Sequence, residues 1–281
     1  MTDSLSPAPQ AVRHERAHGL AELRYEADGP RSALRHLHQC APLRVLFPRP
    51  EPGEPPLAAL VNTAGGLAGG DSLRMEAVAG SGTTVTLCTP AAEKLYRSLG
   101  PETRVSTALR AEAGAVLEWL PQETILFDGA RLRRRLEVDL APDARFLAAE
   151  MLAFGRAARG EGFRRGMLHD SWRLRVEGRL RWADALRLDD PAEALADRFG
   201  FGGAASFATL LLAAPDAAAH LPLLREIAGP LGAATVPREG VALARWLGPA
   251  APVRAALAAA IPALRAAALG LPLLLPRLWT T

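Results

Sequence analysis

Short runs of strand-forming residues, separated by turn residues at intervals of roughly ten positions, recur along the chain up to residue 190 and constrain its fold most strongly. Residues 83–87 are β-branched and stop before Pro90, residues 132–140 alternate apolar and polar side chains, and residues 146–154 are almost continuously apolar. Such a series predicts an all-β body, either a sandwich, a barrel or a β-helical stack. No fixed-period internal repeat is visible.

The pattern changes after Asp190. Residues 221–228 have helical spacing, residues 234–247 again have strand character, and residues 253–264 place apolar side chains on one face of an alanine-rich helix. Pro262 lies inside this second helix and is expected to kink or restart it. The predicted fold is therefore mainly β, a β-helix-like or stacked-sheet body of many short strands, with two α-helices toward the C-terminus.

These patterns suggest one domain behind an N-terminal arm. Residues 1–18 are expected to be disordered. Residues 19–281 are expected to form a single domain, with a β body to about residue 190 and a mixed helix and strand part over residues 191–281. Residues 48–56 hold five prolines and are interpreted as an irregular surface excursion.

Composition excludes several classes of protein. The 281 residues carry a net charge of only +3, and Lys94 is the only lysine. No dense basic run with interleaved aromatics is present, so nucleic-acid binding is not expected. The tightest basic cluster, Arg131 with Arg133–135, is interpreted as the polar face of a strand.

Nothing in the chain predicts export or a membrane span. No convincing run of 18 uncharged apolar residues occurs, and the first thirty residues lack the apolar core of a secretory signal. Two cysteines, Cys40 and Cys88, do not make a disulfide framework. We therefore expect a cytoplasmic, reducing setting.

A glycine-rich loop at residues 62–73 links an apolar run to an alternating one, which predicts strand, loop and strand. Gly65-Gly66 and Gly69-Gly70 precede Asp71, an arrangement that would deliver this carboxylate to a fixed place. The loop lacks the lysine of a Walker motif and the spacing of a dinucleotide fingerprint. A plain turn is the alternative.

The loop resembles the glycine signature of the urease accessory protein UreD (UreH) family, although Asn62-Thr63-Ala64 replaces the usual His-Pro-Pro. Further segments resemble family motifs in the family's order. They are Thr89-Pro90 with Lys94-Leu95-Tyr96-Arg97-Ser98, Trp119-Leu120-Pro121-Gln122-Glu123, Phe127-Asp128-Gly129-Ala130, Gly155-Arg156 with Gly160-Glu161, and Pro276-Arg277-Leu278-Trp279. The resemblance covers the chain from about residue 20 to its end.

The resemblance implies a chaperone that is not an enzyme. It implies work with UreF and the GTPase UreG on apo-urease, and delivery of nickel through an internal passage, with nickel in transit and no tightly bound cofactor. The implied fold is a largely β, β-helix-like body with two helices. Two alternatives remain open: a structural adaptor that recruits the GTPase complex without touching metal, and an enzyme using Asp71 and Glu150 as an acid–base pair.

Four acidic residues are candidates for lining a nickel route, since Ni²⁺ accepts carboxylate ligands and must be held weakly enough to leave. Glu150 is the first, because an unpaired carboxylate inside an apolar strand is expensive. Its structural alternative is an ion pair with an arginine. The other candidates are Asp71, Asp184 and Glu123. The alternative for Asp71 is that it caps a turn. The alternative for Asp184 is a solvated strand residue, and for Glu123 a purely structural role.

Two further groups of side chains stand out in the sequence. His36, His38 and Cys40 would share one face of a strand, a metal-ligand spacing that matches no family motif, and an exposed edge strand is the alternative. Lys94, Tyr96 and Arg97 are interpreted as partner-facing or core-anchoring side chains.

Overall fold

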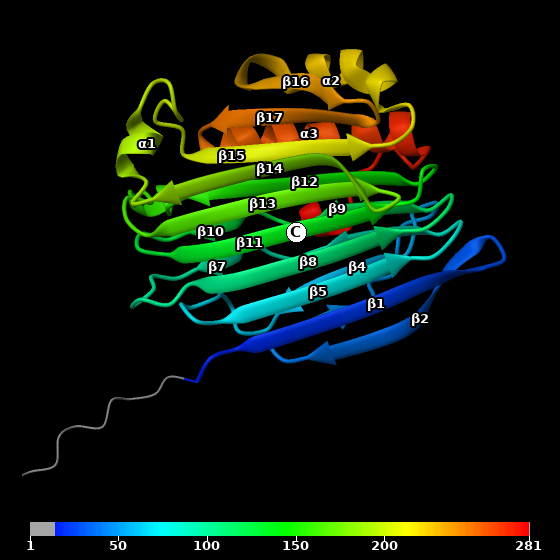
Figure 1. Cartoon of the computed structure of the whole chain (residues 1–281), viewed down its shortest axis with the longest axis horizontal. Coiled ribbons are helices and arrows are strands. Elements are labelled where there is room, and N and C mark those ends of the chain that lie inside the picture. Colours follow the sequence, from blue (N-terminus) through cyan, green and yellow to red (C-terminus); the bar gives the residue numbers. More distant parts are fainter. Residues whose placement is uncertain (1–14, 281) are drawn as a thin grey trace, which may run out of the picture.

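The computed structural model describes residues 15–280 and consists of two stacked β-sheets with helices on one of them (Figure 1). Residues 1–14 of the expected arm lie outside the described residues, and the first strand begins at His18, within the expected arm. The mainly β fold with stacked strands and helices toward the C-terminus is confirmed.

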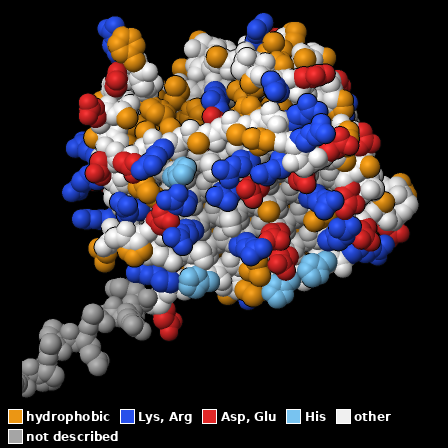
Figure 2. All heavy atoms as spheres, viewed as in Figure 1, with side chains coloured by type: hydrophobic (Ala, Val, Ile, Leu, Met, Phe, Trp, Pro, Cys, Tyr) orange, Lys and Arg blue, Asp and Glu red, His pale blue; other side chains and the backbone are white. Residues whose placement is uncertain are grey.

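The first sheet has seven strands. In spatial order they are β14 (Arg179–Asp189), β13 (Met167–Val176), β11 (Arg131–Leu140), β8 (Thr103–Ala111), β5 (Ser72–Ala79), β1 (His18–Asp28) and β2 (Arg31–Cys40). Its five central strands run parallel, and antiparallel β14 and β2 form the edges. Its outer face is polar, with charged side chains of both signs intermixed over the strands (Figure 2).

The second sheet has ten strands. The main path is β16 (Gly232–Arg238), β17 (Val241–Gly248), β15 (Ser206–Ala213), β12 (Arg145–Phe154), β9 (Val116–Leu120), β6 (Thr84–Cys88), β4 (Leu57–Asn62) and β3 (Leu43–Leu46), with β10 (Thr124–Leu126) beside β12 and β7 (Glu93–Leu95) beside β10. Strands β4, β6, β9 and β12 run parallel.

The chain winds between the two sheets as a solenoid. It passes from β4 to β5, back to β6 and on to β8, then to β9, β11, β12 and β13, changing sheet at almost every step. Successive turns of the solenoid lie in register, but the number of residues in the sequence between paired positions varies. Thr103 pairs with Leu132, whereas Arg131 pairs with Met167, which is further along the chain. This variation explains why the sequence shows no fixed repeat.

One apolar core lies between the sheets, and a second lies between the ten-stranded sheet and the helices. Strand β12 contributes Phe146 to the first core and Leu147 to the second, which accounts for its almost continuous apolar sequence. Strand β11 alternates, but the prediction that its arginine cluster is a polar face is wrong at one position. Arg134 points inward with Leu132, while its neighbours Arg133 and Arg135 are exposed.

The two predicted helices are α2 (Leu221–Ala228) and α3 (Ala250–Leu269). A shorter helix, α1 (Ala192–Ala196), and 3₁₀ turns at Ala157–Arg159, Ala217–His220, Gly229–Leu231 and Arg277–Trp279 complete the elements. Helix α3 ends where Gly270 adopts a left-handed conformation with φ of 66°. By length and composition it is the one helix among residues 15–280 that is long and apolar enough to cross a membrane, and one of its faces packs on the protein.

Helix α3 runs through Pro262 without a break, so the expected restart of the helix at this residue does not occur. A proline inside a helix removes a backbone hydrogen bond and costs about 3 kcal/mol. Here the adjacent Ile261 and the nearby Leu257 and Leu264 are fully buried against the ten-stranded sheet. Burying such side chains stabilises by about 1.5–3 kcal/mol each, enough to hold the helix through the proline.

Candidate functional site

The glycine loop carries the chain from β4 in one sheet to β5 in the other, as the strand–loop–strand prediction required. Its centre pairs with the end of β7: the Leu67 amide donates to the Lys94 carbonyl at 2.8 Å. The buried Asp71 carboxylate accepts hydrogen bonds from the Ala68 amide at 2.7 Å and the Ala17 amide at 2.9 Å. In this structure Asp71 therefore caps the loop.

Two of the loop glycines are required by close packing. A Cβ on Gly66 would lie 2.6 Å from the Tyr96 ring, and one on Gly69 would lie 2.1 Å from the Ser98 hydroxyl oxygen. The Tyr96 hydroxyl donates to the Gly65 carbonyl at 3.0 Å, which ties the two motifs together. Gly70 is left-handed, with φ of 95°.

Other family motifs pack at the same end of the solenoid. The Tyr96 ring meets Phe127 edge-on at 5.2 Å, and the Arg156 guanidinium lies 4.3 Å from the centre of the Phe127 ring. Arg156 also pairs with Glu161, which accepts a hydrogen bond from the Asp128 amide. Lys94 and Arg97 are exposed beside this cluster.

Gln122 instead anchors the C-terminal segment. The Gln122 side chain donates to the Leu278 carbonyl at 2.5 Å and accepts from Arg254 of α3 at 2.8 Å. Glu123 pairs with the same arginine at 3.2 Å. The buried Pro121 also contributes to the wall of a cavity.

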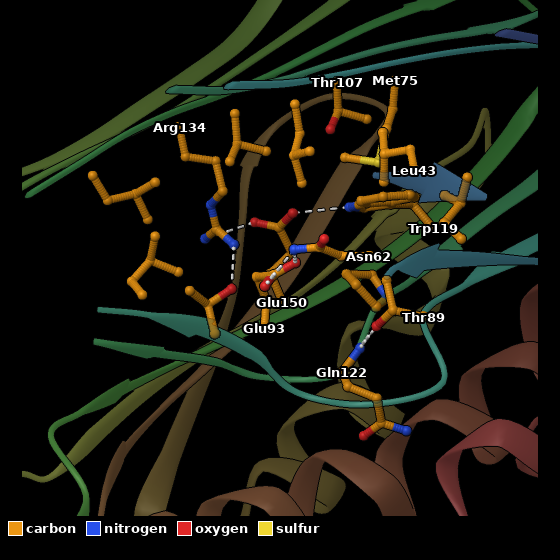
Figure 3. Close-up of a pocket in the computed structure, with 17 residues that line it drawn as sticks. Leu43, Asn62, Met75, Thr89, Glu93, Thr107, Trp119, Gln122, Arg134 and Glu150 are labelled. Atoms are coloured by element: carbon orange, nitrogen blue, oxygen red, sulfur yellow. Dashed lines mark hydrogen bonds and ion pairs between the residues drawn. The ribbon is translucent and has the colours of Figure 1, made fainter. Parts of the chain in front are cut away.

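That cavity, of about 60 Å³, lies between the two sheets (Figure 3). Its wall is mostly apolar, with side chains such as Leu43, Met75 and Trp119. Two acidic side chains, Glu93 and Glu150, also line it. A second cavity, of about 20 Å³, shares Glu150 with the first.

Glu150 projects from β12 into the interior, with 6% of its surface exposed. Its Oε1 accepts a hydrogen bond from the Trp119 indole at 2.8 Å, and its Oε2 lies 2.9 Å from an Arg134 guanidinium nitrogen. That ion pair lacks hydrogen-bond geometry. Arg134 is held mainly by Asp170 on β13, through bonds of 2.9 and 2.7 Å.

One cation thus faces two carboxylates. Burial raises the pKa of Glu150 above its ordinary value, and the Arg134 charge opposes that rise only in part. For Arg134 itself, burial favours the neutral form, but Asp170 and Glu150 together outweigh it and raise the pKa. With all three groups ionised, the cluster carries one negative charge in excess.

Asp184 also lines the second cavity, at its rim, where it forms an ion pair with Arg245. Both side chains are about one third exposed. The structure therefore brings Glu150 and Asp184 to one cavity, while Asp71 and Glu123 line neither cavity.

Glu93 was missed by sequence reasoning. It precedes Lys94 in the short strand β7, and both of its carboxylate oxygens accept from the Asn62 amide, at 3.0 and 3.1 Å. Burial raises its pKa to about 7, and the Asn62 hydrogen bonds oppose that shift. No local feature of the sequence singles out Glu93, because the partner that faces it, Asn62, opens the glycine loop 31 positions earlier.

The raised pKa of Glu93 makes a testable difference to stability. Its folded pKa of about 7 lies above the ordinary 4.5, so the folded state holds the proton more tightly, and wild-type stability falls as pH rises between these values. We expect Glu93→Gln to raise the free energy of unfolding by about 1–3 kcal/mol near pH 8 and to leave it unchanged near pH 4. Urea unfolding at both pH values measures this, and an equal effect at both would contradict it.

Chemically, these side chains suit passing contact with a cation rather than a closed metal centre. Among residues 15–280 no three His, Cys, Asp or Glu side chains converge as a ready metal site. Glu93 and Glu150 are the two carboxylates along a mostly apolar cavity wall. Weak, partial ligation of this kind lets an ion leave again.

The fold and cavity define a two-sheeted β-solenoid with a mostly apolar internal cavity, which two carboxylates line. The family model described as UreD urease accessory protein matches residues 17–280, so the chain belongs to the UreD family of urease accessory proteins. Members of this family are maturation factors rather than enzymes.

Individual relatives of this chain carry the same family name. The urease accessory protein UreD of Granulibacter bethesdensis is 52% identical over 238 residues, covering 84% of this chain and 99% of the relative. That of a Methylobacterium species is 44% identical over 288 residues, covering 99% and 100%. The Magnetococcus marinus protein is 45% identical over 240 residues, covering 82% of each chain.

Proposed function

We propose that this protein delivers nickel to apo-urease in the cytoplasm, acting with UreF and the GTPase UreG, and that the ion crosses the protein interior between the two sheets. The observation that carries the proposal is a pair of carboxylates on one internal cavity, the buried Glu150 and the half-buried Glu93. Burying carboxylates in an apolar interior is costly, and a passing cation offsets that cost.

The proposed route runs from Glu93 to Glu150 and on to Asp184, because the two cavities meet at Glu150 and Arg134. Glu93 exchanges its proton near neutral pH, so it can release a proton as a cation arrives. Arg134 leaves one negative charge in excess at Glu150 and Asp170, which limits how tightly the ion is held. Asp71 and Glu123 have other partners and are left out of the route.

The test is urease activation in cells that carry the urease genes and its accessory proteins, with wild-type protein replaced by Glu150→Gln. We expect urease activity per unit of urease to fall by about tenfold or more, because the amide keeps the shape of the side chain but removes its charge. Co-purification with UreF and urease should be unchanged, and nickel bound to the complex should fall.

A matched control separates transport from stability. Glu118→Gln also neutralises a buried carboxylate with an arginine partner, but Glu118 lines neither cavity. It should lower the free energy of unfolding without reducing the activation produced by the folded protein. If Glu150→Gln supports wild-type activation, or if both variants lose activation equally at matched protein levels, the route is wrong.

The second candidate is a structural adaptor that recruits the GTPase complex to urease without touching metal. It is favoured by the ion pairs that the acidic side chains already form, Glu150 with Arg134 and Asp184 with Arg245. On this alternative, neutralising Glu150 leaves activation intact, whereas charged substitutions on the exposed face of α3, such as Ala255→Glu, abolish both complex formation and activation.

A further inference from the structure

Four donor side chains gather on the outer face of the β1–β2 hairpin, remote from the cavities between the sheets. His36, His38 and Cys40 occupy alternate positions of β2, so they share one face, and all three are exposed. Glu22 lies directly opposite His38 on β1. Figure 2 shows histidine side chains along the lower edge of this sheet, where β1 and β2 lie in Figure 1.

Two of these donors already stand at the spacing of metal ligands. The Cys40 sulfur lies 3.4 Å from Nε2 of His38. With metal–sulfur and metal–nitrogen bonds of about 2.3 and 2.0–2.1 Å, two ligands of one tetrahedral ion lie about 3.5 Å apart. The observed separation therefore needs almost no change to admit an ion.

A third ligand is within reach. Glu22 is the cross-strand partner of His38, and its Oε2 lies 4.0 Å from Nε2 of His36. Because no three donors converge among the described residues, closure of the site requires rotation of exposed side chains. His36 is 57% exposed and Glu22 36%, and exposed side chains change rotamer within nanoseconds.

The charged side chains around these donors do not repel a bound cation. Arg24, two positions from Glu22 on β1, is paired with Glu26 at 3.0 Å and with Glu112 at 3.2 Å. Strand β2 is the edge of its sheet, so one side of the hairpin is open to solvent. The hairpin is held in register by nine pairs from Leu20–Cys40 to Asp28–Arg31, which fixes the backbone beneath the donors.

We propose that Cys40 and His38, with Glu22 as third ligand, form a surface site for one borderline first-row divalent cation such as Zn²⁺ or Ni²⁺. A thiolate with imidazole is the donor set such ions prefer. Binding converts the Cys40 thiol to a thiolate, forms a metal–sulfur bond and releases one proton to solvent. His36 helps to orient the Glu22 carboxylate through its contact with that side chain. The site is separate from the proposed nickel route and does not depend on it.

The test uses the reduced full-length protein and Co²⁺ as the probe, since cobalt bound to thiolate gives a near-ultraviolet charge-transfer band. We expect about one equivalent to produce the band, Cys40→Ser to abolish it, and His38→Ala to weaken cobalt affinity by roughly tenfold or more. Metal should also slow alkylation of Cys40. Matched controls are Cys88→Ala, the buried second thiol, and Glu150→Gln in the cavity.

Both controls should keep the thiolate band. The proposal is overturned if wild-type protein gives no thiolate band, if the band survives Cys40→Ser, or if Cys88→Ala removes it instead. Loss of cobalt binding in Glu150→Gln with a normal Cys40→Ser variant would place the ion in the interior and would equally reject the surface site.

Discussion

Replacing Arg265 with methionine is expected to lower the free energy of unfolding by about 3–5 kcal/mol. Arg265 lies on α3 and is wholly buried, with bonds of 2.7 and 3.1 Å to Glu118 on β9 and 2.6 Å to Glu54. Removal of the cation leaves Glu118 charged in an apolar interior, where burial already raises its pKa and Arg265 opposes that rise.

The effect is large because Arg265 joins three parts of the chain. It connects helix α3, the ten-stranded sheet and the proline-rich loop that contains Glu54. That loop was expected to be a surface excursion, yet Glu54 is only 11% exposed and reaches inward to this ion pair. The arginine therefore holds the loop and the helix on the same face of the sheet.

Urea unfolding followed by circular dichroism measures the loss. Arg74→Met is the matched control, because it removes an equivalent charge from an exposed pair with Glu76 and should cost less than about 1 kcal/mol. The double variant Arg265→Met/Glu118→Gln should recover part of the stability, since it no longer buries an unpaired charge. Equal losses for Arg265→Met and Arg74→Met would contradict this account.

Much of the fold follows from local pattern. Alternation in β11 and the continuous apolar run of β12 reflect which faces are buried, one face in the first case and both in the second. Helical spacing located α2 and α3 for the same reason. The division of strands between two sheets was not predictable this way, because alternation shows which side chains point inward but not which strand lies alongside.

The candidate site was harder to predict because its geometry is made by distant residues. Glu150 stood out as a charge in an apolar strand, but its partner Arg134 was assigned to a polar face with the neighbouring arginines. Strict alternation with Leu132 and Leu136 would have turned Arg134 inward. Glu93 carried no such local signal, since its environment depends on Asn62, which is 31 positions away in the sequence.

Replacing Arg134 with methionine is expected to lower the free energy of unfolding by about 3–5 kcal/mol near pH 8, and by less near pH 5. The substitution leaves Glu150 and Asp170 facing each other without a cation. The folded pKa of Glu150, already raised by burial, must rise further when the opposing Arg134 charge is lost. A raised carboxyl pKa costs stability as pH increases, so the deficit grows from acid to neutral pH.

Added nickel should restore part of the free energy of unfolding that Arg134→Met loses. This variant therefore tests directly whether Ni²⁺ reaches the interior. Without the arginine, two carboxylates face the cavity that they share with Asp184, and a divalent cation can replace the missing charge. We expect added Ni²⁺ to raise the unfolding midpoint of Arg134→Met more than that of wild type or of Arg245→Met, whose partner Asp184 is partly exposed. If nickel stabilises all three equally, ions do not reach Glu150, and the interior cannot be the path that the metal takes.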